Sequence, residues 1–569
     1  MALREEAFLL TSNIESISGL SYGVNRPAKS GSNPIWPSLS GSGSVPDWGV
    51  GYISTRVNGA TTELFTTCFD GPNINTVHLG SPETTDGTTI TRPTRGLITF
   101  NGNTTNNLIT PGGYTRNQFR VTWDSVTSKY KCFAYWNNGS NFYIDLFEAT
   151  SPQTTGWGSY VQRISAPLGA GVASAQACEP TALFRRADGR WCLYIQTSQG
   201  GTADYQGARR HLGMLLGPSD NTLVGTWTSV GAGANNEILT SPSGSEQYYH
   251  SGGWVDGDLV YVPIGIFDGS AAPPGGHAFS GTVNRIHKVQ LFVGRASDPT
   301  TLTLADGSWL SSTGVEGAWE GGEIIGANNV AEVGNEWRYY YAGDADTHHQ
   351  SPELSRLMGV ASIGRRQIGR VTGTGSVTLA AITPGASGGM SVTVIAESGT
   401  VKLELLNSST GAVLTGYSQT DCDAITADGT EQTVTWRGSH VAPADAKIKA
   451  YVTSGELNYV SATTITGGLK LDTAGDTAWT QGATGASIGR QITVYTARGV
   501  RDSVGMSVYS AAGGRVRVQG TDASKWEVSL DGSSWAQSQV VSAGRTDMYL
   551  SVTPSSSDAA LSCDIGVSP

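Results

Sequence analysis

One pattern recurs about every 60 to 80 residues along the first two-thirds of this chain. Each copy contains a β-rich run, a tight turn and a second run that is dense in aromatic residues. The second runs occupy residues 63–70, 130–137, 190–197, 258–268 and 336–344. Five such units predict five radially arranged β-meanders, because each unit buries its apolar faces only against its neighbours. The alternative is a pair of β-sandwiches with coincidental spacing.

The composition favours strands over helices. The chain has 75 Gly among 569 residues, and only 15% of its residues are charged. It offers few helix-length runs of Ala, Leu, Glu, Lys and Arg, so short strands joined by Gly-rich turns are expected. The 15 Trp and 21 Tyr are expected mostly in the core, although sugar rings also pack on such faces. We therefore predict an all-β protein.

Charge and hydropathy exclude several classes of partner. The net charge of −11 and the absence of a basic stripe argue against nucleic acid. No stretch approaches the roughly 20 apolar residues of a membrane helix. The start of the chain lacks a basic segment followed by an apolar run, so we expect no signal peptide. The six Cys are scattered without metal-ligand spacing, so we expect neither a structural metal nor a cofactor, and no dependence on disulfides.

Three domains are predicted from these patterns. Residues 1–366 hold the five repeats, which we interpret as a five-bladed β-propeller and the candidate catalytic domain. Alternating strands across 367–466 predict a β-sandwich packed on the propeller. A turn-rich boundary precedes residues 467–569, where alternation predicts a second small β-sandwich with an accessory or assembly role.

The repeats and the segments 403–423 and 433–437 together resemble the five-bladed glycosidases of glycoside hydrolase families 32 and 43, the fructosidases and arabinanases. The resemblance covers about residues 40–465 and leaves the last domain out. It implies that acids at the starts of the innermost strands of blades one, two and three face an axial funnel. A glycosidic bond needs two carboxylates on opposite sides, one protonated and one ionised.

Carrying this resemblance over assigns acids to two blades and leaves one blade without. Asp47 directly precedes the first strand and matches the base or nucleophile, although a turn Asp after Pro is the alternative. Glu179, between Cys178 and Pro180 and before an apolar strand, matches the general acid. Asn117 stands where the second blade should carry an Asp. Since Asn supplies no charge, another acid takes that role or the chemistry is altered.

Other residues are candidates near the same funnel. Glu323, which precedes a strand in blade five, is the predicted third catalytic acid; a polar loop between blades is the alternative for it and for Glu320. His250 occupies the corresponding point of blade four, as a substrate contact or a structural residue. Asp344 is assigned to the funnel rim, although its loop also has carboxylates and imidazoles suited to a metal. The remaining predicted substrate contacts are Trp48, Asn117, Trp319 and Glu320.

Two functions follow from these assignments. The first is a glycoside hydrolase that cleaves a polysaccharide, either a furanoside polymer or a bacterial surface glycan, as in a phage tail-associated depolymerase. The second is a non-catalytic glycan-binding propeller on a virion or cell surface, which Asn117 favours. We favour the first function, with a polysaccharide as the partner. The sequence is compatible with a homo-oligomer and with a virion-associated protein or one released by lysis, and it decides neither.

Overall fold

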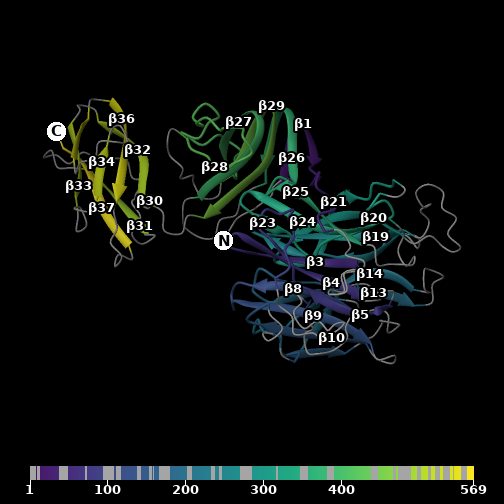
Figure 1. Cartoon of the computed structure of the whole chain (residues 1–569). Helices are drawn as coiled ribbons and strands as arrows, with labels where there is room; N and C mark the ends of the chain where they lie inside the picture. Colours follow the sequence, from purple (N-terminus) through teal and green to yellow (C-terminus); the bar gives the residue numbers. More distant parts are fainter. Residues whose placement is uncertain are drawn as a thin grey trace. The chain divides into compact units, whose positions relative to one another are not determined.

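The computed structural model describes Phe8, residues 13–36, most of residues 49–464 and, from Leu469 to Ser568, the strands alone. Between 49 and 464 the description omits 71–72, 94–107, 110–116, 138–141, 153–156, 158, 166–179, 201–207, 232–236, 243–245, 269–284, 316–317, 346–355, 381–389 and 437–445. Every regular secondary-structure element in the described part of the chain is a β-strand (Figure 1), which confirms the all-β prediction. Nor does this part contain a helix long and apolar enough to cross a membrane.

Two compact units divide the chain. One unit comprises Val24–Ile368, and the other combines Met1–Gly23 with Gly369–Pro569. The predicted boundaries at 366 and 466 stay a prediction. Residues 14–23, which the sequence analysis placed with the repeats, belong to the second unit, because β1 (Ile14–Val24) pairs in the sheet of that unit.

The first unit contains five antiparallel sheets in its described residues, which we number I to V in chain order. Sheet I holds β3 (Gly49–Asn58), β4 (Thr61–Asp70), β5 (Asn73–Gly80), β6 (Glu83–Thr84) and β7 (Leu108–Ile109). Sheet II holds β8 (Asn117–Asp124), β9 (Lys129–Asn137), β10 (Phe142–Ala149) and β11 (Gln162–Ser165). Sheet III holds β12 (Pro180–Arg185), β13 (Trp191–Gly200), β14 (Ala208–Leu216), β15 (Thr228–Val230) and β16 (Glu237–Leu239).

The last two sheets of this unit contain longer and shorter strands together. Sheet IV holds β17 (Glu246–Ser251), β18 (Trp254–Asp256), β19 (Leu259–Asp268), β20 (Arg285–Arg295) and β21 (Asp298–Ser311). Sheet V holds β22 (Glu323–Ile325), β23 (Ala331–Val333), β24 (Glu336–Asp344), β25 (Leu357–Gly364) and β2 (Ala28–Lys29). The aromatic-rich runs of the sequence fall on β4, β9, β13, β19 and β24, and their starts agree with those of the strands within two residues.

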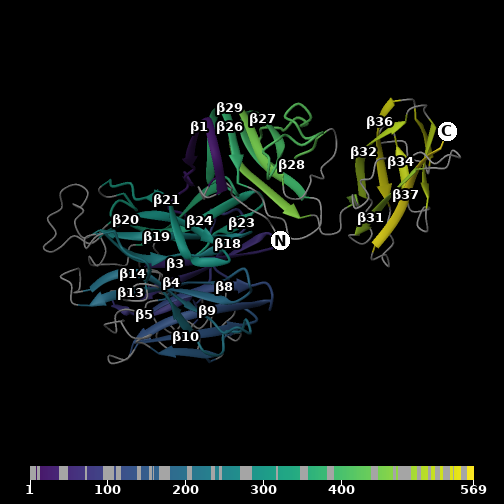
Figure 2. The ribbon, with the colours of Figure 1, turned by 180° about the vertical axis from the view of Figure 1, so that it is seen from behind.

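Apolar clusters join each sheet to the next. One cluster lies between sheets I and II, a second between II and III and a third between III and IV. A fourth cluster combines residues of sheets IV, V and I, so the contacts return to the first sheet. Figures 1 and 2 both show β3 between β24 and β8, in agreement with the contacts of β3 with these two strands. Burial of the alternate faces of all five sheets is the main apolar stabilisation of this unit.

The second unit contains three sheets in its described residues, of five, five and three strands, and we call the one with the longest strands the larger sheet. The larger sheet has the order β1, β26 (Gly369–Leu379), β29 (Ala446–Thr464), β27 (Met390–Asn407) and β28 (Glu431–Thr433). Gly375 permits the close approach of β1, because a Cβ atom there would clash with the carbonyl oxygen of Ser18. The smaller sheets contain β30 (Leu469–Leu471), β31 (Ile488–Tyr495), β37 (Ala560–Ser568), β33 (Gly514–Gln519) and β35 (Ser538–Val541), and β32 (Asp502–Ser510), β36 (Gly544–Val552) and β34 (Trp526–Ser529).

Candidate active site at the strand starts

Buried polar side chains lie on the first strands of sheets I to IV and in the loop that follows β22, the first strand of sheet V. Ser54 of β3, Arg120 of β8, Thr181 of β12, Ser251 of β17 and Asn328 after β22 are each at most 6% exposed. We call these residues the axial polar cluster. Asn328 Nδ2 donates to Ser54 Oγ at 2.6 Å, Arg120 Nη1 donates to the Ser251 carbonyl at 2.9 Å, and the Thr181 and Ser251 hydroxyls are 2.7 Å apart. With the bond from the Val121 amide to Ser54 Oγ at 3.1 Å, these bonds link the first strands of sheets I to IV and the loop after β22 in one buried group.

The cluster contains a buried cation. The Arg120 guanidinium lies 4.7 Å from the ring centroid of Tyr52, and the Tyr52 ring meets the His250 ring edge-on at 5.9 Å. A guanidinium over an aromatic face is stabilised by the ring quadrupole, especially where water is excluded. The region around this cluster is therefore packed and polar, and it contains the positive charge of Arg120.

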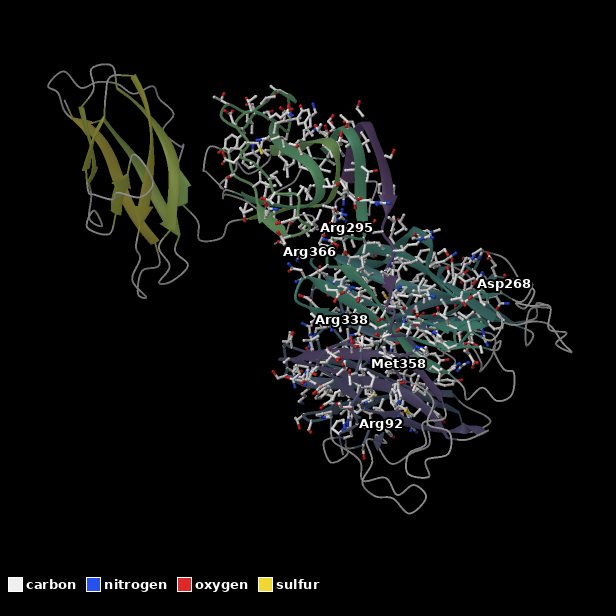
Figure 3. The ribbon with its side chains drawn as sticks, turned by 45° about the horizontal axis from the view of Figure 1, so that its top comes forward. Arg92, Asp268, Arg295, Arg338, Met358 and Arg366 are labelled. Atoms are coloured by element: carbon white, nitrogen blue, oxygen red, sulfur yellow. The ribbon has the colours of Figure 1, made fainter. Side chains whose placement is uncertain are left out.

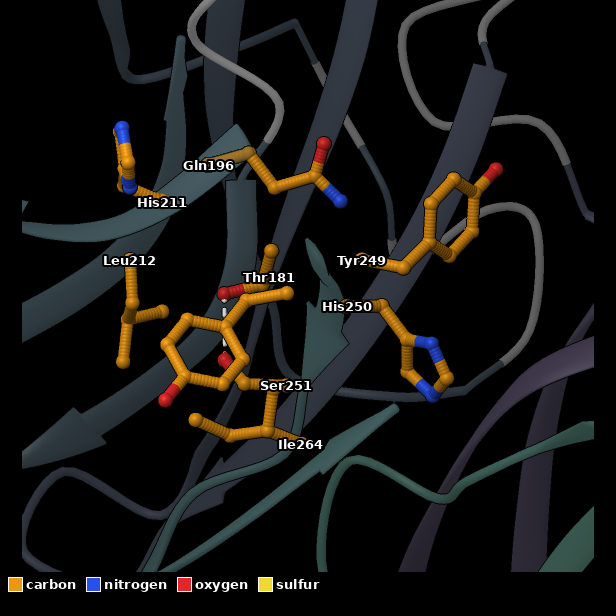
Figure 4. A pocket seen from close by; sticks show the side chains of 9 residues that line it. Thr181, Gln196, His211, Leu212, Tyr249, His250, Ser251 and Ile264 are labelled. Carbon is orange, nitrogen blue, oxygen red and sulfur yellow. Dashed lines mark hydrogen bonds between the residues drawn. The ribbon is translucent and has the colours of Figure 1, made fainter. Parts of the chain in front are cut away.

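His250, a predicted substrate contact, lies within this packed region. It is 2% exposed, and a Cβ atom at Gly265 would approach its Cε1 to 2.5 Å, so the imidazole lies against the backbone of β19. Figure 4 shows His250 in the wall of a small pocket beside Thr181, Gln196 and Ser251. The gaps between the lining side chains do not admit a water molecule, so this pocket does not hold a sugar in this conformation.

Two predicted acids meet in sheet V. Glu323, the first residue of β22, pairs in register with Asp344, the last residue of β24, and the two residues are 1% and 3% exposed. Arg356 directly precedes Leu357, which pairs with Gly343, so Arg356 comes level with Asp344. Arg356 Nη2 lies 3.2 Å from Glu323 Oε1 and 3.5 Å from Oε2. We call Glu323, Asp344 and Arg356 the charged row.

The apolar residues next to the charged row on the same strands show which face of sheet V it lies on. Side chains two residues apart on a strand share a face, so Ile325, Ala342 and Met358 continue the charged row. These three residues pack with Val50 and other residues of β3 in one apolar cluster (Met358 is labelled in Figure 3). The charged row therefore lies on the side of sheet V that faces the start of β3.

Glu320 and Trp319, both predicted substrate contacts, lie on the opposite face of sheet V. Lys29 Nζ is 2.6 Å from Glu320 Oε1, and the Tyr341 hydroxyl donates to Glu320 Oε2 at 2.7 Å. Burial, with the charge and hydrogen bond of Glu320, raises the pKa of Tyr341 well above its ordinary value. Trp319 lies 5.6 Å from the Tyr341 ring. These contacts tie Glu320 to Lys29 of β2 and to Tyr341 of β24, on the face of sheet V opposite Glu323.

Several predicted residues are outside the description. Asp47, Trp48 and Glu179 lie outside the described residues. Asp47 and Trp48 come two residues and one residue before the start of β3, and Glu179 comes one residue before the start of β12. Asn117 begins β8 and pairs with Tyr135, while its side chain is outside the description. Their assigned roles stay predictions.

Sequence reasoning overlooked a second pair of acids. In sheet IV, Glu246, the first residue of β17, pairs in register with Asp268, the last residue of β19. Lys288 Nζ lies 2.9 Å from Glu246 Oε1. The signal was present, since Asp268 ends an aromatic-rich run as Asp344 does. The sequence analysis instead chose His250 as the matching position in this blade.

Two arginines were also overlooked. Arg120 is a charge within the apolar run of β8, which is a usable signal because an unpaired charge is rarely buried. Arg356 follows a stretch outside the described residues, and nothing in its sequence neighbourhood predicts a partner. Within the described part of the chain, no group of three His, Cys, Asp or Glu side chains could hold a metal ion.

Comparison with known proteins gives structural neighbours alone. No protein-family model matches the sequence, and no curated protein matches it. One similar solved structure is of the GH130 family of mannoside phosphorylases, which contains glycoside hydrolases that target β-1,2 mannosidic linkages in Candida mannan. It has 12% identity and a TM-score of 0.39 over 62% of this chain and 96% of that chain.

Two further neighbours are also glycoside hydrolases. A glycosyl hydrolase from Bacteroides ovatus has 12% identity and a TM-score of 0.38, covering 63% of this chain and 98% of its own. The catalytic domain of the Coprinopsis cinerea GH62 α-L-arabinofuranosidase has 11% identity and a TM-score of 0.39, covering 60% and 97%. Similarity at this level carries no argument about this chain. Membership of families 32 or 43 stays a prediction.

Proposed function

We propose that this protein is a glycoside hydrolase whose five sheets are the blades of a β-propeller, with the active site where the first strands begin. The observation that supports this most is the axial polar cluster, because its hydrogen bonds bring together the first strands of sheets I to IV and the loop after β22, the first strand of sheet V. Residues that open these strands then converge around one axis. They include Glu323 and, by their positions in the chain, Asp47 and Glu179.

The proposed chemistry uses these carboxylates in different protonation states. Glu179 donates a proton to the leaving oxygen as general acid, and Asp47 acts as base or nucleophile on the opposite side of the sugar. Glu323 supplies the negative charge that Asn117 cannot, and it stabilises the positive charge that develops on the sugar ring. The guanidinium of Arg356 lies 3.2 Å from Glu323 Oε1 and holds this carboxylate by a charge-assisted hydrogen bond.

The substrate in this proposal is a polysaccharide. We infer a furanoside polymer or a bacterial surface glycan, and a role as a phage tail-associated depolymerase, from the resemblance and composition of the sequence alone. Incubation with arabinans, fructans and a panel of bacterial surface polysaccharides, followed by detection of new reducing ends, tests both the activity and the substrate class.

The decisive variant is Glu179→Gln. Loss of a general acid is expected to lower turnover by about 100-fold or more while the fold is retained. Glu336→Gln is the matched control, because Glu336 begins β24 at the end remote from Asp344 and its side chain is 39% exposed. The control should hydrolyse like the wild type. Near-normal turnover by a folded Glu179→Gln protein would remove Glu179 from the mechanism.

A non-catalytic glycan-binding propeller is the second candidate, and the observation in its favour is Asn117 at the start of β8. In that case the wild-type protein would bind a polysaccharide of the panel and release no reducing ends. Retained binding by the Glu179→Gln variant, with hydrolysis by the wild type, would instead favour the hydrolase.

A further inference from the structure

Arg356 links the predicted third acid to two other parts of the site. Its guanidinium contacts Glu323, its position directly before β25 brings it level with Asp344, and its carbonyl accepts a hydrogen bond from the Val50 amide at 3.2 Å. We propose that Arg356 is a positioning residue, which holds the Glu323 and Asp344 carboxylates in place opposite the start of β3. The catalytic consequence of this inference rests on the proposed function.

The charged row combines two acids with one cation in a buried setting. Glu323 and Asp344 are directly opposite on paired antiparallel strands, which places their Cβ atoms about 4.5–5.5 Å apart. Like charges at that separation repel, and little water is present because all three side chains are buried. A guanidinium beside them offsets the repulsion and fixes carboxylate geometry through directional hydrogen bonds.

The backbone of Arg356 ties this row to sheet I. Val50 is the second residue of β3, three positions after Asp47. Because Arg356 accepts the Val50 hydrogen bond with its backbone and contacts Glu323 with its side chain, one residue fixes the distance between the start of β3 and the start of β22. A general acid or base must be held within a fraction of an ångström, and a displacement of about 1 Å can cost about 100-fold in rate.

Two substitutions at Arg356 separate charge from shape. Arg356→Met keeps much of the side-chain length and removes the charge, and Arg356→Lys keeps the charge but loses the planar fork. The control is Arg163→Met, which also breaks an ion pair with a buried carboxylate. Arg163 of β11 donates from Nε and Nη2 to the carboxylate of Asp145 of β10 at 2.7 and 2.9 Å. The Asp145 side chain is fully buried.

The measurements are kcat and KM on the polysaccharide that the wild type hydrolyses, together with thermal unfolding. We expect kcat of Arg356→Met to fall about 100-fold with KM changed less than about threefold, and Arg356→Lys to fall about tenfold. Arg163→Met should keep kcat within about twofold, although it unfolds at a lower temperature. If folded Arg356→Met keeps the kcat of the control, the positioning role is wrong. If Arg356→Met does not fold, a normal kcat of Arg356→Lys has the same meaning.

Failure of the proposed function is distinguished by a second readout. If the wild type hydrolyses nothing on the panel, the function fails, and crystal structures of the wild type and the Arg356 variants decide the positioning role. We expect the Glu323 and Asp344 carboxylates to move apart by about 1 Å or more in Arg356→Met, owing to their mutual repulsion. Unchanged carboxylate positions would overturn the inference whatever the activity.

Discussion

Asp124 forms an ion pair that joins sheets II and III at the end of the first unit remote from the strand starts. It is the last residue of β8, and its side chain is fully buried. Arg185, the last residue of β12, donates to it from Nε at 3.0 Å and from Nη2 at 2.8 Å. Lys131 Nζ lies 3.7 Å away, and the Thr127 hydroxyl also donates to the carboxylate. Asp124→Asn removes the charge and keeps the shape.

The magnitude follows from burial. Removing one partner of a buried ion pair costs about 3–5 kcal/mol. Arg185 is 18% exposed, so water partly solvates its guanidinium after the change, and we expect the lower end, about 3 kcal/mol. The unit from Val24 to Ile368 has roughly 345 residues, and unfolding entropy is about 2.1 cal/mol/K per residue. The melting temperature should therefore fall by about 4 °C.

The effect should depend on pH in a defined direction. Burial alone would raise the pKa of Asp124, but the hydrogen bonds from Arg185 and Thr127 and the nearby cationic charges outweigh it and lower the pKa. A lowered folded pKa gives stabilisation that is complete above the unfolded pKa of about 3.9 and is lost as pH falls through the folded value. The difference between wild type and Asp124→Asn should be constant from pH 7 to about pH 5 and should narrow below pH 4.

Urea unfolding followed by tryptophan fluorescence measures this difference. Asp188→Asn is the control, because the Asp188–Arg186 pair is exposed and should contribute less than about 1 kcal/mol. A loss below about 1 kcal/mol for Asp124→Asn would refute the reasoning, and so would a difference that is as large at pH 3 as at pH 7.

Two further predictions concern thiols and domain independence. Burial raises the pKa of Cys192 to about 12, and Cys68, Cys132 and Cys422 are also buried. These four thiols should therefore react with Ellman's reagent at pH 8 only after unfolding. Rapid reaction of more than two of the six thiols in the folded protein would contradict this prediction. Deletion of residues 467–569 should leave a soluble, folded protein. The strands β30 to β37 pair among themselves, and the described core of the larger sheet contains Phe8 and residues no later than Ala462. An insoluble 1–466 fragment would show that the last segment is required.

Local patterns were sufficient to predict the strands. The aromatic-rich run at 336–344 coincides with β24, and the runs at 130–137 and 258–268 lie in β9 and β19. Alternating and apolar strand patterns depend on which faces are buried, and that information is local to the chain. The same reasoning placed Glu323 just before a strand, and in the structure it is the first residue of β22.

The relation between distant strands was beyond such patterns. β1 pairs with β26 rather than with any strand of the repeats. It forms the edge of that sheet, and Gly375 allows its backbone to approach β26 closely. Glu320 and Glu323 look equivalent in sequence, yet Glu320 contacts Lys29 and Tyr341 on one face of sheet V while Glu323 faces β3.

The sequence by itself determined that the chain is all-β, that five similar units occupy its first two-thirds, and which acids stand beside strand starts. Only the tertiary structure decided that Glu323, Asp344 and Arg356 form one row and that Arg120 is buried against the first strands of neighbouring sheets. Strand register is the physical reason. A shift of one residue in the pairing of β22, β24 and β25 would move each charge to the opposite face, and that register is set by packing against sheet I rather than by local sequence.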